Sequence, residues 1–296
     1  MTAGSVGENC VRVACLQVTA EREFEPNIEK LCRMISAAGE EGAKFVLTPE
    51  NATMIEPVAA AALSKAKPES SHPALPILAE AASAAGVWLL IGSLSVKLSG
   101  GKLANRSILI DNKGAIIARY DKLHCFDVSL RDDEWYRESD TIKAGTKAVL
   151  APSPWGKIGL TVCYDLRFPS LYRTLAQAGA HILTVPSAFT RTTGQAHWHT
   201  LLQARAIETG CFVIAPAQWG EHAEGRKTYG HSLIVDPWGA IIADGRDGEK
   251  LVSGTLDMDL VANSRRRIPS LHAQQNFTLV DLTTTAAPTQ FTAEQR

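Results

Sequence analysis

Short apolar runs alternate with segments of helical periodicity along most of the chain. Apolar runs of about four to eight residues between turn residues are typical of strands, whereas apolar positions about every three or four residues are typical of helices. In the first half, the pattern predicts strands and helices in alternation at 11–18, 27–42, 45–48, 74–85 and 87–96. The second half repeats that order at 157–162, 169–178, 181–185, 196–209 and 211–217.

Each half ends in a predicted β-hairpin of the same design. The segments Ile108–Ala118 and Leu233–Ala243 both contain two apolar runs around a turn that begins with aspartate and ends with glycine. Aspartate favours such turns because it bonds nearby backbone, and glycine favours them because it tolerates positive φ. The two halves therefore indicate an internal pseudo-two-fold repeat, with a chance likeness of two common turns as the alternative.

Two apolar sheets cannot each face water. The natural packing places one sheet against the other and covers the outer faces with the amphipathic helices. The sequence thus predicts an α/β fold, a four-layer α-β-β-α sandwich. A further strand at 251–256 and a basic segment at 263–268 follow. We expect a tail at 1–9, a single domain at 10–282, and a tail at 283–296 that is either mobile or clasps a partner.

Three residues with chemically useful side chains follow predicted strands. Glu50 and Lys122 come at the ends of short apolar runs, and Cys163 precedes a turn that leads to Pro169. In open α/β sheets, ligands bind outside the carboxyl ends of strands. A thiol on a tight turn near a helix N-terminus is favoured as the thiolate, and a glutamate there can transfer protons. Each also has a structural reading, as a core cysteine, a solvated acid or a surface lysine.

These residues and their surroundings resemble the nitrilase superfamily, the carbon–nitrogen hydrolases. The resemblance covers about residues 11–277, and its strongest stretches are Thr48–Asn51, Asp121–His124, Cys163–Pro169 and Pro186–Gly239. It implies the same sandwich fold, a catalytic triad of Glu50, Lys122 and Cys163, and no cofactor. It also implies a homodimer or higher homo-oligomer that pairs through helices beside the site.

The resemblance implies an amidase that converts a small-molecule carboxamide to carboxylic acid and ammonia through a cysteine thioester. Glu50 would carry the protons, and Lys122 would stabilise the oxyanion together with the backbone N–H of Tyr164. Glu138 is suggested as a second glutamate that positions Lys122 or the substrate, although its charged neighbours are also typical of a solvated loop.

Further residues are candidates for substrate binding. Arg167 is expected either to pair with a substrate carboxylate or to form a salt bridge with Asp165 or Glu208. His124 is expected to pack or hydrogen-bond rather than transfer protons. The substrate-binding candidates are Tyr164, Arg167, His124, Ser187 and Phe189.

Within the superfamily, the chain most resembles the Nit subgroup. The segment Ala217–Ser232 resembles the deaminated glutathione amidases more than the ω-amidases, whereas 129–141 departs from the subgroup. Alternatives are an ω-amidase acting on 2-oxoglutaramate or succinamate, and an N-carbamoyl amino acid hydrolase. A true nitrilase and a glutaminase domain fit less well. A catalytically silent binding scaffold is the non-enzyme alternative.

Composition limits the partners and the cellular compartment that we expect for the protein. A net charge of −1 gives no bulk electrostatic reason to bind nucleic acid or an anionic membrane. No signal peptide is visible at the start, and the longest apolar run, 87–96, is too short to span a bilayer. The six cysteines form no disulfide framework, so we expect a cytoplasmic protein with reduced thiols. We expect no metal site, because His197 and His199 face different directions on a helix.

Overall fold

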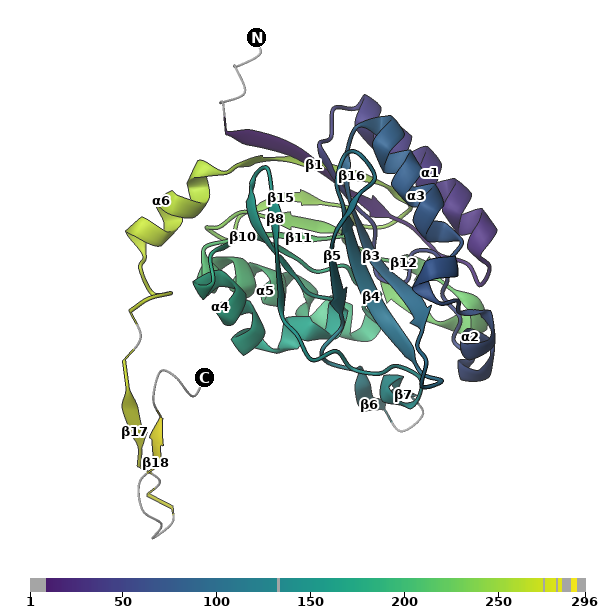
Figure 1. Ribbon diagram of the computed structural model, residues 1–296. Helices are drawn as coiled ribbons and strands as arrows, with labels where there is room; N and C mark the ends of the chain where they lie inside the picture. The colour runs from purple at the N-terminus through teal and green to yellow at the C-terminus, as the bar shows by residue number, and fades with distance from the viewer. Residues whose placement is uncertain (1–8, 132–133, 274, 281, 284–288, 292–296) are drawn as a thin grey trace.

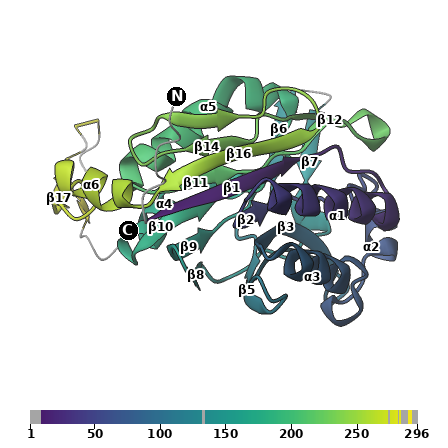
Figure 2. The ribbon, with the colours of Figure 1, turned by 90° about the horizontal axis from the view of Figure 1, so that it is seen from above.

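The computed structural model describes residues 9–131, 134–273, 275–280, 282–283 and 289–291. Two six-stranded sheets lie at the centre, and helices cover their outer faces (Figure 1). This is the α-β-β-α sandwich that the sequence predicts. Seen from above, α1 and α3 lie on one side of the sheets, and α4 and α5 lie on the other (Figure 2).

The first sheet has the strand order β16-β1-β2-β3-β4-β5, in which β1, β2 and β3 run parallel and the other pairs are antiparallel. Its strands are β1 Cys10–Gln17, β2 Phe45–Leu47, β3 Trp88–Lys97, β4 Leu103–Ile110, β5 Ile116–Asp121 and β16 Lys250–Asp257. The associated helices are α1 Phe24–Glu40, α2 Ala59–Lys65 and α3 Ala74–Ala85. Helix α3 has the bounds that the sequence predicts, because Gly86 ends it with a left-handed φ of 64°.

The second sheet has the order β15-β14-β11-β10-β9-β8 and the same design. Three parallel strands lead into an antiparallel hairpin, and one antiparallel strand borders the opposite edge. Its strands are β8 Val149–Ser153, β9 Gly156–Leu160, β10 Ala180–Thr184, β11 Phe212–Ala215, β14 Leu233–Val235 and β15 Ile241–Asp244. Its helices are α4 Pro169–Gln177 and α5 Arg191–Thr209. The predicted internal repeat is therefore present in the topology.

The central strands are buried on both faces. Along β1, Val11, Val13 and Cys15 belong to the core between the sheets, whereas Ala14 and Leu16 belong to the core beneath α1 and α3. Successive side chains of a strand point to opposite faces, so one strand contributes to two cores. This explains why the strand reads as a continuous apolar run rather than an alternating one.

Helix α5 begins earlier than predicted. The sequence indicates a start at Ala196, but the helix begins at Arg191 and includes Gly194. A side chain at Gly194 would place its Cβ 2.3 Å from the ring of Tyr229, so this helical position requires the close approach that only glycine permits. Glycine lowers local helix propensity, which hid the first turn from the sequence pattern.

The remaining elements are short segments that connect or follow the sheets. They are η1 Glu69–Ser71, β6 Asp127–Arg131, β7 Glu134–Arg137, η2 Glu138–Asp140, η3 Cys163–Arg167, β12 Trp219–Glu221, η4 Ala223–Gly225, β13 Lys227–Tyr229, α6 Asp259–Arg267, β17 Phe277–Leu279 and β18 Thr289–Phe291. Beyond α6 the described chain runs away from the sandwich, and β17 pairs with β18 (Figure 1). The predicted division into tails at 1–9 and 283–296 and a domain at 10–282 stays a prediction, since most of both tails lies outside the described residues. Among the described helices, none has both the length and the apolar character needed to cross a membrane.

Candidate active site

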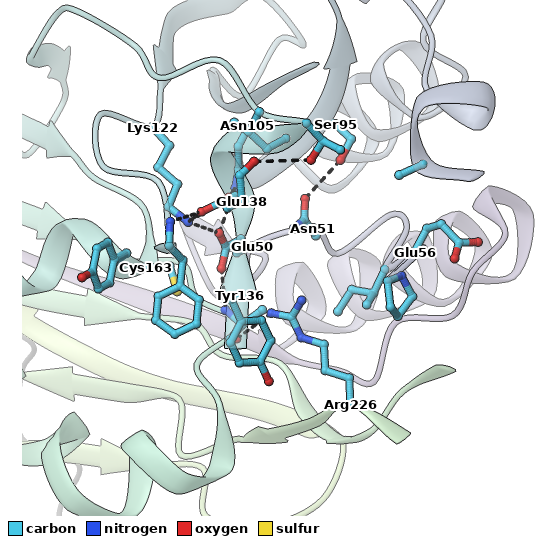
Figure 3. Close-up of a pocket in the computed structure, with 18 of the residues that line it drawn as sticks. Glu50, Asn51, Glu56, Ser95, Asn105, Lys122, Tyr136, Glu138, Cys163 and Arg226 are labelled. Atoms are coloured by element: carbon cyan, nitrogen blue, oxygen red, sulfur yellow. Dashed lines mark hydrogen bonds and ion pairs between the residues drawn. The ribbon is translucent and has the colours of Figure 1, made fainter. Parts of the chain in front are cut away.

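Three strand ends deliver the predicted triad to one place. Glu50 follows β2 and Lys122 follows β5, both in the first sheet, whereas Cys163 follows β9 in the second. Figure 3 shows the three side chains converging on one cavity. The packing of sheet on sheet therefore unites Glu50 and Cys163, which are more than a hundred positions apart in the sequence.

The carboxylate of Glu50 accepts hydrogen bonds from three donors. Its Oε1 accepts hydrogen bonds from Lys122 Nζ at 2.9 Å and Asn105 Nδ2 at 2.8 Å, and its Oε2 accepts one from the Ala188 N–H at 2.8 Å. The Cys163 thiol also interacts with this carboxylate and lowers its pKa. Burial pushes the pKa of Glu50 upward, but the Lys122 charge and the hydrogen bonds outweigh it, so the pKa lies below its usual range. The buried carboxylate is thus ionised.

Lys122 lies between two carboxylates. Its Nζ is 2.9 Å from Glu50 Oε1 and 2.8 Å from Glu138 Oε2, and the residue is 2% exposed. Burial alone would lower the pKa of Lys122, but Glu138 and Glu50 raise it well above its usual value. Glu138 is itself fixed, because its Oε2 accepts the Phe126 N–H at 2.6 Å. The site therefore holds a permanent cation beside the thiol.

Cys163 has an unusual backbone conformation. Its φ is +50°, and its N–H donates to the Pro186 carbonyl at 3.0 Å. A non-glycine residue in this region is strained, and such strain is typical of functional turns. Burial raises the pKa of the thiol and the Glu50 charge raises it further, while Lys122 opposes them. The prediction that this turn favours a thiolate is therefore wrong for the resting site, where burial dominates over one short 3-10 turn.

Asp165 organises the turn that carries the thiol. It is fully buried, and its carboxylate accepts hydrogen bonds from Tyr120 Oη at 2.6 Å and the Val162 N–H at 2.8 Å. The His124 N–H and Nδ1 bond its other oxygen at 3.1 and 2.7 Å, and the His124 ring stacks on Phe168. His124 thus supports the turn by hydrogen bonding and packing.

A cavity of about 470 Å³ opens in front of these groups. Of the predicted site residues, those that line it are Glu50, Lys122, Glu138, Cys163, Tyr164 and Phe189. Predicted substrate-binding residues outside this lining are His124, Arg167 and Ser187. Ser187 is fully buried and donates its hydroxyl to the Val185 carbonyl at 3.0 Å, a structural contact.

Arg167 has neither of the salt bridges that the sequence suggests. Its Nη2 lies 3.3 Å from His197 Nδ1, and its guanidinium lies 5.3 Å from the centre of the Phe189 ring. Asp165 is occupied by the contacts described above, and Glu208 pairs with an arginine of its own helix at 2.9 Å. Arg167 therefore flanks the cavity behind Phe189.

Sequence reasoning missed most of the other residues that line the cavity, including Asn105, Tyr136 and Arg226. Asn105 had only a weak signal, because it is one of three consecutive polar residues in β4, with Arg106 and Ser107. It bonds Glu50, and its Nδ2 lies 3.1 Å from Glu138 Oε1. Tyr136 and Arg226 lie on small hairpins whose sequences carry no comparable signal.

One cluster has the composition of a metal site. The ligand atoms of His199, His231 and Asp244 all lie within 4.8 Å of one another. The set differs from the His197 and His199 pair that the sequence analysis rejected. Asp244 bonds His231 Nδ1 at 2.9 Å and His199 Nε2 at 3.2 Å, so hydrogen bonding already accounts for the arrangement. None of the three residues lines the cavity in front of Cys163.

Known proteins resemble this chain in both sequence and structure. Residues 12–266 match the family described as "Carbon-nitrogen hydrolase". Deaminated glutathione amidase of Yersinia enterocolitica is 38% identical over 262 residues, which are 88% of this chain and 91% of the relative. The protein of the same name from Synechocystis sp. is 40% identical over 269 residues, 87% of this chain and 96% of the relative. The crystal structure of the C. elegans NitFhit protein matches with a TM-score of 0.85 and 34% identity, covering 91% of this chain and 66% of that longer chain.

Proposed function

Since the chain belongs to the carbon–nitrogen hydrolase family, we propose that its Glu50, Lys122 and Cys163 hydrolyse the amide bond of a deaminated glutathione-like substrate. The enzyme class is a hydrolase of carbon–nitrogen bonds in linear amides. The observation that carries the site assignment is the contact of one buried carboxylate with both a lysine and a thiol in a single cavity.

Formation of the thioester begins from a neutral thiol. Glu50 has a lowered pKa and the thiol a raised one, so proton transfer is unfavourable until a substrate arrives. As sulfur attacks the amide carbon, the S–H bond becomes acidic and Glu50 takes its proton. Lys122 and the backbone N–H of Tyr164 stabilise the oxyanion, and a single donor of this kind typically contributes about 3 to 4 kcal/mol.

Collapse of the tetrahedral intermediate uses the same proton. Glu50 donates it to the nitrogen, the carbon–nitrogen bond breaks, and the acyl group stays on Cys163 as a thioester. Glu50 then deprotonates water, which attacks the thioester, and the proton returns to the sulfur as the acid leaves. While Glu50 is neutral, Glu138 remains as the carboxylate partner of Lys122 at 2.8 Å. Glu138 thereby preserves the lysine charge throughout the cycle.

The product depends on the substrate class. A primary carboxamide releases ammonia, as the sequence analysis expects. Deaminated glutathione has amide bonds only between its components, so its hydrolysis releases an amine-bearing fragment instead. The shared name of the curated relatives favours this substrate over the ω-amidase and N-carbamoyl alternatives, and over a silent scaffold.

Two broader expectations are also proposals. All six cysteines are free, which supports a reducing, cytoplasmic location. Exposed apolar side chains near α5 and α6, at Ile207, Trp238 and Ile268, support a homodimer or higher homo-oligomer. Light scattering during size-exclusion chromatography measures the assembly, and a monomer at micromolar concentration would contradict it.

Turnover of deaminated glutathione tests the proposed function. We expect Cys163→Ala to abolish release of the amine fragment, and Cys32→Ala, a matched change on α1, to leave it unchanged. Mass spectrometry of the quenched wild-type enzyme should find the acyl group on the peptide that contains Cys163. Undiminished turnover in Cys163→Ala would contradict the proposed mechanism, and turnover of a different amide alone would reassign the substrate.

A further inference from the structure

Arg226 reaches the cavity from a wall that has no part in the triad. It follows the short turn η4 and precedes β13, and its guanidinium extends toward the ring of Tyr136 from β7 (Figure 3). The guanidinium carbon lies 5.9 Å from the centre of that ring. Both side chains line the cavity together with Cys163.

The guanidinium is incompletely satisfied. Its Nη2 donates to the Ala188 carbonyl at 3.2 Å, whereas its Nε is buried without a hydrogen-bond partner. Within the described ranges of the chain, Arg226 forms no salt bridge. Because arginine has five N–H donors, the guanidinium keeps donors beyond the Nη2 contact for an acceptor in the cavity that it lines.

A loose loop does not explain the unmet donor. The Arg226 carbonyl accepts the His222 N–H at 2.7 Å. The His222 ring lies 2.8 Å from the Thr228 hydroxyl. Glu224, in the same loop, pairs with Arg22 at 2.9 Å. The backbone that presents Arg226 is therefore held on both sides of the residue.

The charges around the cavity restrict what can bind. Glu50 and Glu138 share one lysine, so the reacting end carries excess negative charge. Glu56 also lines the cavity, but Arg22 and Lys65 neutralise it. A substrate anion would thus be repelled near the thiol and attracted at Arg226. Arginine recognises carboxylates with two parallel N–H groups, and the Tyr136 ring limits where its plane can lie.

We infer that Arg226 binds a carboxylate of the amide substrate, with its guanidinium held against Tyr136. This inference rests on the proposed function, and it transfers to Arg226 the role that the sequence suggested for Arg167. It defines the substrate as an amide with a carboxylate away from the scissile bond. Deaminated glutathione has such a group on each side of its amide bonds.

Kinetics with Arg226→Gln test the inference. We expect kcat/KM for an amide that bears a carboxylate to fall at least about tenfold, mainly through KM, while a neutral amide of equal length changes less than about twofold. Arg226→Lys should recover part of the loss. Lys227→Gln, which removes one charge from the adjacent exposed position, should change neither substrate. An equal loss with both amides, or no loss with either, would overturn the inference.

A binding measurement separates this inference from the proposed function. In the Cys163→Ala background, calorimetry with glutarate should give a dissociation constant at least about tenfold lower than in Cys163→Ala/Arg226→Gln. If the wild-type enzyme cleaves no amide, the proposed function fails while this comparison still decides the carboxylate site. Equal affinity of both variants for glutarate would refute it.

Two labelled substrates show whether the carboxylate that Arg226 binds lies on the acyl part or on the amine part of the substrate. One carries the carboxylate on the acyl part and the other carries it on the amine part. Because only the acyl part stays on Cys163, slowed thioester hydrolysis in Arg226→Gln assigns the carboxylate to the acyl part. Slowed thioester formation with unchanged hydrolysis assigns it to the amine part. Unchanged rates of both steps with both substrates would contradict a contact with Arg226.

Discussion

Replacement of Glu138 by glutamine tests the electrostatic design of the site. Both oxygens of Glu138 accept hydrogen bonds: Oε1 from Lys122 at 3.1 Å, and Oε2 from Lys122 at 2.8 Å and the Phe126 N–H at 2.6 Å. A glutamine amide has one acceptor and one donor group. Its carbonyl oxygen can replace Oε2 and still accept from both Lys122 and Phe126, but its NH2 group then replaces Oε1 and faces the donors of Lys122 and Asn105.

The magnitude follows from the burial of Lys122. Two unit charges about 3 Å apart attract with about 5 to 6 kcal/mol at an effective dielectric constant of about 20. Removing one partner of a buried pair typically costs about 3 to 5 kcal/mol, but Glu50 remains in contact with the lysine. Since that contact remains, we expect Glu138→Gln to lower the free energy of unfolding by about 2 to 3 kcal/mol, at or below the lower limit of that range.

The same change has a defined pH dependence. Glu138 and Glu50 raise the pKa of Lys122 above its usual value, so their attraction to Lys122 stabilises the fold below the unfolded pKa of the lysine for as long as the carboxylates are ionised. The stabilisation is lost as the pH rises through the higher folded pKa. Without Glu138 the folded pKa falls, so the alkaline loss of kcat/KM should begin at lower pH in Glu138→Gln.

Urea unfolding and a pH–rate profile measure the two effects. Asp140→Asn, which removes a neighbouring exposed carboxylate from the same turn, is the matched control and should shift neither. An unchanged alkaline limb together with a stability change below about 0.5 kcal/mol would refute the assignment of Glu138 as a positioning residue for Lys122.

Two other substitutions test the packing of helix α5 at Gly194 and the dependence of the Glu50 pKa on Lys122. Gly194→Ala should lower the free energy of unfolding by about 2 kcal/mol despite its better helix propensity, because the new Cβ would meet the Tyr229 ring at 2.3 Å. Gly100→Ala, with open space around it, should stay within about 0.5 kcal/mol in the same urea titration. Lys122→Met should raise the pKa of Glu50, whose depressed value depends on the lysine, and so move the acid loss of stability to higher pH. A stability–pH curve for Lys122→Met with an unmoved acid limb would contradict that account.

The sequence predicted the elements that have a strong apolar period. Most strands of the two sheets, helix α3 and the two Asp-to-Gly hairpins lie where the pattern indicates them, because burial between two layers demands continuous apolar runs. Strand β8 was not predicted. The short hairpins β6–β7 and β12–β13 were missed. Their strands are charged and partly exposed, so they lack the apolar alternation that a pattern search detects.

The site was predictable only as far as strand ends and family motifs allow. Glu50, Lys122 and Cys163 follow strands, so topology brings them together. The unmet donor of Arg226 depends on which side chains surround it after folding, and no local pattern encodes that. The protonation of Cys163 was predicted wrongly because the sequence indicates a turn but does not indicate how deeply the turn is buried.

The pairing of β1 with β16 has a consequence for synthesis on the ribosome. Cys10 lies opposite Asp257, so the strand made first meets its antiparallel neighbour only when most of the chain has been translated (Figure 2). Until then, the nascent first sheet exposes the edge of β1, in which six of the eight residues are apolar. The first half therefore emerges as a sheet in which one edge of β1 lacks its partner strand. A chain that stalls before residue 250 would aggregate with other nascent copies through this unpaired edge.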